Sequence, residues 1–247
     1  MKKIVIVGAT SAIAEHCARL WIQESPIELI LVGRDQAKSE RLAQDLRVRS
    51  PQSKIAIQFT DFIDPLRIKD WADAVNAEGV PDIVLIAHGS LPDQMICQKD
   101  LRACEAALAV NGVSPVLFAE AFAGPMQLAD RGTLAIIGSV AGDRGRKSNY
   151  VYGAAKGLVT RYAQGLQHRL AATNVKVVLI KPGPTDTPMT AHLKAQGAKL
   201  ADVGDVAQRV VDGVAQGKPV IYAPGKWALI MMIVRHLPRF VFNKMDI

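Results

Sequence analysis

The sequence predicts a doubly wound α/β fold in which a parallel sheet of seven strands is covered by helices on both faces. Seven short runs of β-branched and aliphatic residues recur along the chain, and segments with helical spacing separate them. The runs are nearly continuous in apolar residues, which is typical of parallel strands buried on both faces. Regular alternation of strand and helix, with right-handed crossovers, then gives the doubly wound arrangement.

The elements follow one another in a regular order. The predicted strands are residues 4–7, 29–32, 55–59, 83–87, 134–137, 175–180 and 220–222. The predicted helices are residues 14–24, 37–49, 66–77, 101–122, 152–172 and 206–216. Because ligands of such sheets bind beyond the carboxyl ends of the strands, the residues that follow each strand are the candidates for chemistry.

A single domain is expected over residues 1–225, followed by an apolar and basic tail over residues 226–247. The 247 residues, 49% hydrophobic and 21% charged, can bury a full core, and no linker, repeat or charge block divides them. The first apolar run is too short for a secretory signal. The three cysteines have neither metal-site nor disulfide spacing, so no metal site is expected and a reducing cytoplasm is the expected compartment.

The net charge of +7 fits nucleic acid, an anionic membrane surface or a phosphate-bearing ligand, and charge alone does not choose among them. Nucleic acid ranks last, because the basic residues are dispersed and no aromatic-basic recognition motif interrupts the α/β pattern.

The segment after the first strand is a candidate pyrophosphate-binding turn. Gly8, Thr10, Ser11, Ala12 and Ile13 stand between a strand and a helix, where backbone N–H groups can point at a phosphate. An ordinary strand-to-helix turn is the alternative. The spacing resembles the GxxxGxG turn of the short-chain dehydrogenase/reductase family, with alanine at positions 12 and 14 in place of the second and third glycines. A methyl group at position 14 affects helix packing, whereas one at position 12 crowds the approach to a cofactor.

This resemblance implies a Rossmann-type domain that uses a nicotinamide cofactor to interconvert a carbonyl and an alcohol. At the end of the second strand, Gly33 supplies no carboxylate for the ribose of NAD. Arg34 offers a guanidinium to a 2′-phosphate, which favours NADP(H) over NAD(H). A solvated surface arginine that pairs with Asp35 is the alternative.

Two more strand ends resemble the family's cofactor site in part. Asp61 and Phe62 resemble its adenine-contacting aspartate and the apolar neighbour, although Asp61 can equally cap the next helix. The segment with Ala87 and Gly89 takes the place of the family's Asn-Asn-Ala-Gly motif, keeping the glycine and a small residue but neither asparagine. His88 is expected to be packed or hydrogen-bonded, without a chemical role.

Tyr152 and Lys156 are the candidate acid–base pair. Four residues apart on a helix, they share a face, about 40° apart around the axis. The ammonium group is expected to lower the pKa of the phenol. Ser139 follows the fifth strand, and with it the two residues resemble the family's Ser-Tyr-Lys triad, in which serine holds the substrate oxygen, tyrosine transfers the proton and lysine also binds the nicotinamide ribose. Tyr150 lacks this spacing and is expected at the helix entry or in the substrate pocket.

Two other segments complete the family resemblance. Pro115 has no N–H for the carbonyl of Asn111, so the helix is expected to open there. Elsewhere such a pair signals a kink; here a water held at Asn111 fits the family's proton relay from tyrosine through lysine. The loop after the sixth strand resembles the family's PGxxxT loop around the nicotinamide carboxamide, and its candidate residues are Pro182, Gly183, Thr185 and Thr187.

The tail is apolar, aromatic and basic together. Its eight uninterrupted apolar residues, 227–234, are fewer than the about 20 that span a bilayer. One interpretation is an interfacial helix, peripheral on the inner face of the cytoplasmic membrane and attracted to anionic lipid. The other is a helix packed on the domain or on a dimer partner.

Short matches resemble one subgroup of the family, the bacterial decaprenylphosphoryl-2-keto-pentose reductases of cell-envelope biosynthesis. They are residues 89–94, 149–153 and 237–242. The resemblance implies a lipid-linked small-molecule substrate whose 2-keto group is reduced, and a partner flavin oxidase. Family resemblance also implies a homo-oligomer. The alternatives are a reductase of another lipophilic ketone, fatty-acyl or steroid-like, and a dinucleotide-sensing protein without catalysis, which the alanines of the turn favour.

Overall fold

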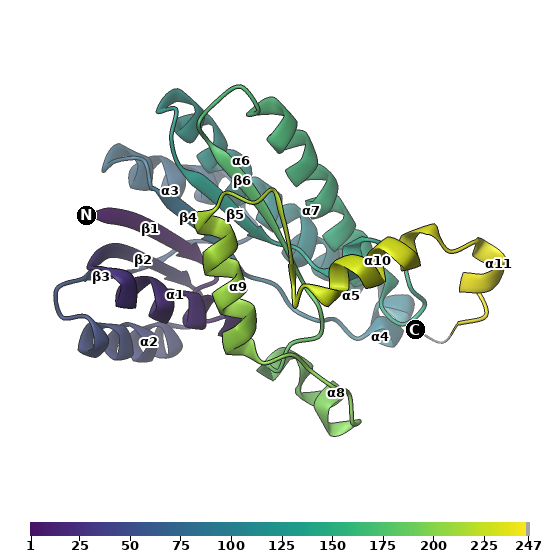
Figure 1. Ribbon diagram of the computed structural model, residues 1–247. Coiled ribbons are helices and arrows are strands. Elements are labelled where there is room, and N and C mark those ends of the chain that lie inside the picture. The colour runs from purple at the N-terminus through teal and green to yellow at the C-terminus, as the bar shows by residue number, and fades with distance from the viewer. Residues whose placement is uncertain (246–247) are drawn as a thin grey trace.

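The computed structural model describes residues 1–245, and in that part of the chain seven parallel strands form one sheet between two layers of helices (Figure 1). The strand order is β3-β2-β1-β4-β5-β6-β7, so the succession reverses direction between β1 and β4. The predicted doubly wound fold is therefore confirmed. The strands are β1 (Lys2–Val7), β2 (Ile27–Gly33), β3 (Lys54–Phe59), β4 (Ile83–Ile86), β5 (Thr133–Ile137), β6 (Lys176–Pro182) and β7 (Val220–Ala223).

Two of the helices on the sheet begin at an aspartate that caps them. The carboxylate of Asp35 accepts a hydrogen bond from the backbone N–H of Lys38, and Asp64 caps the next helix, which has Pro65 in its first turn. The helices on the sheet are α1 (Ala12–Glu24), α2 (Gln36–Arg49), α3 (Pro65–Ala77), α5 (Leu101–Leu108), α6 (Ser114–Leu128), α7 (Tyr150–Arg169) and α9 (Val203–Ala215). Four short elements have no signal in the sequence pattern: α4 (Gln94–Lys99), α8 (Ala191–Ala195) and the 3-10 turns η2 (Val140–Gly142) and η3 (Pro188–Thr190).

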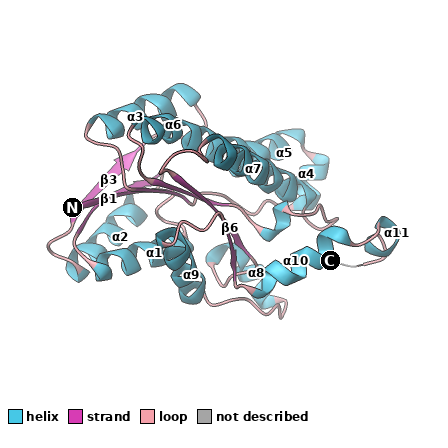
Figure 2. Ribbon diagram, turned by 45° about the horizontal axis from the view of Figure 1, so that its top comes forward, coloured by secondary structure: helices cyan, strands magenta, loops and turns pink. Residues whose placement is uncertain are grey.

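Two hydrophobic cores cover the two faces of the sheet. Figure 2 shows α1, α2 and α9 on one side and α3, α6 and α7 on the other. On the first side, Trp21 of α1 and Val210 of α9 pack against Leu29 and Leu31 of the sheet. On the second, the rings of Phe118 and Phe122 are fully buried. The strands read as unbroken apolar runs because both of their faces are covered.

The helix expected over residues 101–122 is divided by a π-helical segment, η1 (Ala109–Val113). The backbone N–H of Ser114 donates to the carbonyl of Ala109, five residues back, directly before Pro115. The helix therefore opens at the place where the proline was expected to open it. The whole run Leu101–Leu128 is long and apolar enough to cross a membrane by length and composition, but half of its most apolar window is buried inside the protein, as in a core helix.

The tail forms α10 (Lys226–His236) and α11 (Arg239–Phe242), at the right of Figure 1. Met231 is buried, and the Arg144 guanidinium donates to the carbonyls of Val234 and Leu237 at the end of α10. The same guanidinium lies 3.7 Å from the ring centroid of Phe242. One side of the tail thus packs on the domain. Residues 246 and 247, the end of the predicted tail, lie outside the described residues.

Candidate active site

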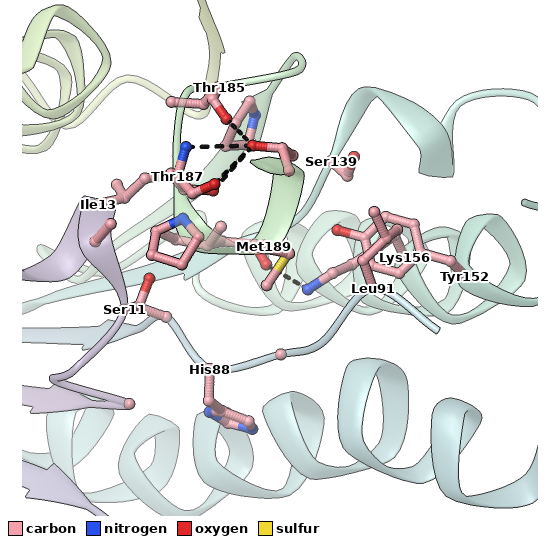
Figure 3. A pocket seen from close by; sticks show the side chains of 18 of the residues that line it. Ser11, Ile13, His88, Leu91, Ser139, Tyr152, Lys156, Thr185, Thr187 and Met189 are labelled. Atoms are coloured by element: carbon pink, nitrogen blue, oxygen red, sulfur yellow. Dashed lines mark hydrogen bonds between the residues drawn. The ribbon is translucent and has the colours of Figure 1, made fainter. Parts of the chain in front are cut away.

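A cavity of about 750 Å³ opens at the carboxyl ends of the strands. It brings together most of the residues singled out in the sequence, from segments as far apart as the β1–α1 turn and the loop after β6 (Figure 3). The predicted residues that line it are Gly8, Thr10, Ser11, Ala12, Ile13, Arg34, Phe62, Ala87, Gly89, Ser139, Tyr152, Lys156, Pro182, Gly183, Thr185 and Thr187.

Asn111 and Asp61 do not line the cavity. The carboxylate of Asp61 accepts hydrogen bonds from the backbone N–H groups of Ile63 and Asp64 in its own turn. That turn positions Asp64, which is the cap of α3. Asp61 therefore neither caps the helix nor points its carboxylate at the cavity.

The turn at the start of α1 has the geometry of a phosphate cradle. Gly8 has φ +82°, and a β-carbon there would lie 2.6 Å from the backbone nitrogen of His88. Ser11 is the N-cap residue of α1 but its side chain makes no capping hydrogen bond. The N–H groups of the first helical turn are left for a ligand, which fits the pyrophosphate of a dinucleotide. The methyl group of Ala14 is fully buried in the core, as expected of helix packing.

The end of β2 presents positive charge to the cavity. A β-carbon at Gly33 would lie 2.7 Å from Oγ of Ser39, so close packing favours glycine there. Asp35 caps α2 and pairs with Lys38, with 3.6 Å between Nζ and Oδ2, instead of pairing with Arg34. The Arg34 guanidinium lies 5.6 Å from the ring centroid of Phe62. Arg34 and Lys38 both line the cavity at this end.

His88 is a packed, neutral residue. Its Nε2 is 2.8 Å from Oγ of Ser114, and its ring meets that of Phe62 edge-on at 4.9 Å between centroids. Burial, with the charges of Lys156 and Arg34, lowers the pKa of His88 to about 3. The imidazole is uncharged at neutral pH, in keeping with the packed residue expected there.

Ser139, Tyr152 and Lys156 converge on one side of the cavity, opposite Ser11 and Ile13 (Figure 3). Ser139 follows β5, and its side chain lies close enough to the phenol of Tyr152 to lower the pKa of that phenol. Tyr152 and Lys156 lie one turn apart in α7. Nζ of Lys156 donates to the carbonyl of Ile137 at 3.0 Å. Tyr150, in the same turn of α7 as Tyr152, is 45% exposed and does not line the cavity.

The expectation that Lys156 lowers the pKa of Tyr152 is wrong. Burial raises the pKa of Tyr152, and the neighbouring Ser139 side chain opposes that rise. Nζ of Lys156 is 5.9 Å from the centre of the Tyr152 ring and points at the Ile137 carbonyl. Because Lys156 is itself buried, its own pKa falls to about 8.

Asn111 lies behind the lysine, fully buried in η1. Its Oδ1 accepts from the backbone N–H of Ser90 at 2.8 Å and its Nδ2 donates to the carbonyl of Ala107 at 2.9 Å. A β-carbon at Gly89 would lie 2.9 Å from Oδ1 of Asn111 and 3.7 Å from Nζ of Lys156. Glycine therefore keeps the space between these two groups open.

The tail packs against the loop after β6 through Trp227. A β-carbon at Gly183 would lie 1.9 Å from Nε1 of Trp227, so the indole rests directly on the backbone of this loop. Within the loop, Thr185 Oγ1 donates to the Gly183 carbonyl, and Thr190 Oγ1 bonds to the carbonyls of Thr185 and Thr187. Trp227 of α10 thus supports the part of the cavity wall that this loop forms.

Several further residues line the cavity that no motif of the sequence had singled out one by one. Leu91, Met189 and Leu193 make an apolar wall, and Arg146 and Asn149 add polar groups between Ser139 and Tyr152. No periodicity identifies them, because each lies in a loop or in a short helix whose position depends on the rest of the fold. Within residues 1–245 no cluster of three or more His, Cys, Asp or Glu side chains is arranged to hold a metal ion.

Comparisons with known proteins agree with this geometry. Residues 2–198 match the family model described as short chain dehydrogenase. The chain is 32% identical to an uncharacterized oxidoreductase of Mycobacterium tuberculosis, over 98% of this chain and 96% of the relative. It is 29% identical to an uncharacterized oxidoreductase of Streptomyces coelicolor, over 99% and 96%.

Among solved structures, a short-chain dehydrogenase from Sphingobium yanoikuyae in complex with NADPH matches with a TM-score of 0.85 at 20% identity, covering 100% of this chain and 97% of that one. A bulky-bulky ketone specific alcohol dehydrogenase from Comamonas testosteroni matches with a TM-score of 0.81 at 20% identity, over 100% and 95%. These likenesses concern the fold. The family match and the relative of 32% identity together show that the chain is an oxidoreductase of the short chain dehydrogenase family.

Proposed function

We propose that this protein is an NADPH-dependent reductase of a ketone, and that the ketone is the 2-keto group of a polyprenyl-phosphate-linked sugar. The observation that carries the first part is the convergence of Ser139, Tyr152 and Lys156 in the cavity that also holds the phosphate cradle. A bound nicotinamide cofactor supplies the hydride for the reaction. The remaining chemistry belongs to side chains of this chain.

Ser139 and Tyr152 are the groups proposed to contact the carbonyl oxygen of the substrate. The Ser139 hydroxyl orients that oxygen by a hydrogen bond. The raised pKa of Tyr152 keeps its phenol protonated at neutral pH, so it can donate a proton as negative charge develops on the oxygen. Charge on Lys156, held by the Ile137 carbonyl, then stabilises the phenolate electrostatically.

A proton must return to Tyr152 after each turnover. Lys156, whose pKa of about 8 is close to neutrality, can release and regain a proton without a large energetic cost. Asn111 stands on the far side of the space that Gly89 leaves open. We propose that Asn111 takes part in the proton relay through this space.

The positive end of the cavity supports NADP(H) over NAD(H). Arg34 is not engaged by Asp35, and Lys38 lies beside it. A forked guanidinium suits a 2′-phosphate, whereas the ribose hydroxyl of NAD calls for a carboxylate at the end of β2. In this proposal the ring of Phe62 contacts the adenine, and Asp61, whose carboxylate is held in its own turn, does not.

The tail supports a lipid-linked substrate. Leu229, Met232, Ile233 and Phe240 are each more than half exposed. Together with Lys226, Arg235 and Arg239 they form an apolar and basic surface of the kind that lies on anionic membranes. We place the protein in the cytoplasm, peripheral on the inner face of the membrane, with residues 1–225 as the catalytic domain. A flavin oxidase that makes the ketone is the proposed functional partner, and a homo-oligomer the proposed assembly.

The test is a turnover assay with the full chain. NADPH and NADH oxidation is measured with a polyprenyl-phosphate ketosugar and, in parallel, with a steroid ketone and a fatty-acyl ketone. Turnover of the sugar with NADPH supports the proposal. If only the steroid or fatty-acyl ketone is turned over, the substrate is a lipophilic ketone and not a lipid-linked sugar. The apolar wall of Leu91, Met189 and Leu193 would explain that outcome.

The alternative of a dinucleotide sensor makes the opposite prediction for the tyrosine. Tyr152→Phe is expected to reduce kcat about 10²- to 10⁴-fold, because it removes the proton donor, while cofactor affinity stays unchanged. Cellular function that survives Tyr152→Phe, with cofactor binding intact, would overturn the enzyme proposal.

Membrane contact is tested separately by co-sedimentation with anionic and zwitterionic vesicles. Ile233→Asp should abolish binding to the anionic vesicles. Equal sedimentation of wild type and variant would remove the membrane from the proposal.

A further inference from the structure

Arg146 is a cavity-lining cation with no counter-charge among the residues that the structure describes. It lies between Ser139 and Tyr152 in the sequence and lines the same cavity. Its Nε is buried and has no hydrogen-bond partner among residues 1–245. Burial is the cause of the lowered pKa of its guanidinium, and no carboxylate of the described chain offsets it. An arginine in such a position costs free energy in the protein without ligand, so a ligand group that pairs with it recovers that cost.

Asn149 adds an acceptor next to this donor. It also lines the cavity, and its Oδ1 is buried without a hydrogen-bond partner within residues 1–245. Asn149 occupies the N-cap position of α7, where asparagine normally caps the helix, yet its side chain makes no capping hydrogen bond. Its backbone N–H donates to the carbonyl of Arg146 at 3.2 Å, so one tight turn carries both side chains.

The chemistry of the two groups defines what can satisfy them. A guanidinium presents paired N–H donors that match the oxygens of a phosphate, and an amide oxygen accepts from a hydroxyl. Phosphate at this place would also face the N-terminal end of α7, whose dipole favours negative charge. Arg34 and Lys38, which serve the other end of the cavity, come from a different part of the fold and leave Arg146 for the substrate side.

We infer that Arg146 and Asn149 form a substrate subsite that binds a phosphate ester or diester together with a neighbouring hydroxyl group. This inference deepens the proposed reductase function and rests on it for the identity of the ligand as substrate. Tyr152, three residues after Asn149, is then placed next to a ketone on the same molecule. Substrates that carry phosphate are selected over neutral ketones of similar size.

The test is a binding measurement that needs no turnover. Farnesyl phosphate, farnesol and inorganic phosphate are titrated calorimetrically into the full chain, with and without NADP⁺. The proteins are the wild type, Arg146→Gln, Arg146→Lys and the control Arg161→Gln, which changes an exposed arginine of α7 outside the cavity. Melting temperatures of all four check that the fold is retained.

Loss of a charge-assisted hydrogen-bond pair predicts about 10- to 100-fold weaker binding of farnesyl phosphate by Arg146→Gln. Arg146→Lys should restore part of this affinity, and Arg161→Gln should match the wild type. Farnesol and NADP⁺ should bind equally to all four proteins. Equal affinity of wild type and Arg146→Gln for farnesyl phosphate, or a parallel loss of affinity for farnesol, would overturn the subsite.

The two phosphate probes separate the sources of the anion. Tight binding of farnesyl phosphate with weak binding of inorganic phosphate supports a lipid-linked ligand, whereas similar binding of both supports a water-soluble phosphate ester. The result is also independent of catalysis. Binding that depends on Arg146, without turnover of any ketone, would support the subsite and contradict the reductase proposal. Turnover of a ketone with no dependence of binding on Arg146 would support the reductase proposal and contradict the subsite.

Discussion

Replacing the buried lysine should make the protein more stable while it destroys the proposed chemistry. Lys156 is 2% exposed, and its charge has one hydrogen bond, to the Ile137 carbonyl, to compensate for lost solvation. Burial lowers its pKa from 10.5 to about 8. At about 1.4 kcal/mol per pKa unit, the charged form costs about 3 kcal/mol of folding free energy. Lys156→Met removes that cost and keeps the side-chain length.

The sign of the pH dependence follows from linkage. The unfolded chain keeps Lys156 protonated up to its usual pKa, whereas the folded protein releases the proton above about pH 8. The cost is therefore complete below pH 8 and fades as the pH rises towards 10.5. Between pH 7 and pH 10 the penalty falls by about 2 kcal/mol, and the difference in stability between variant and wild type should shrink by this amount.

Urea unfolding at pH 7, 8, 9 and 10, without cofactor, measures this gap. At pH 7 the variant should be more stable by up to about 2 kcal/mol, since leaving the Ile137 carbonyl unpaired costs about 1–3 kcal/mol. Lys218→Met, at an exposed lysine, is the matched control and should run parallel to the wild type. If Lys156→Met also runs parallel to the wild type, the ammonium is not desolvated and the low pKa is refuted.

Three further predictions test the cavity walls. Arg34→Ala should raise the KM for NADPH about 10- to 100-fold and leave the KM for NADH nearly unchanged, because a charge-assisted bond to the 2′-phosphate is lost; equal effects in steady-state assays with both cofactors would refute the role of Arg34. Gly183→Ala should cost about 1–3 kcal/mol in urea unfolding, since its β-carbon would lie 1.9 Å from Trp227 Nε1 and the indole must move; an unchanged midpoint would contradict that contact. Arg144→Ala removes the bonds to the last carbonyls of α10, so limited proteolysis should cut the tail faster than in the wild type while the domain stays resistant.

Much of the fold was readable from the sequence because its signals are local. Each of the seven strands lies within two residues of the predicted bounds, since buried parallel strands need continuous apolar runs. The opening of the helix at Asn111 followed from Pro115 alone. The shared face of Tyr152 and Lys156 followed from helical spacing, and Ser139 joined them through its place at a strand end together with the resemblance to the family's Ser-Tyr-Lys triad.

What the sequence determined by itself is the order of strands and helices, the edge of the sheet that carries the chemistry and the residue types placed there. The tertiary structure decided how those side chains are solvated and paired. The rise in the pKa of Tyr152 and the absence of a hydrogen-bond partner for Arg146 Nε within residues 1–245 both depend on groups from other elements. Burial and pairing depend on which groups are close in space. The sequence pattern predicts such proximity only between residues of the same helical turn or strand.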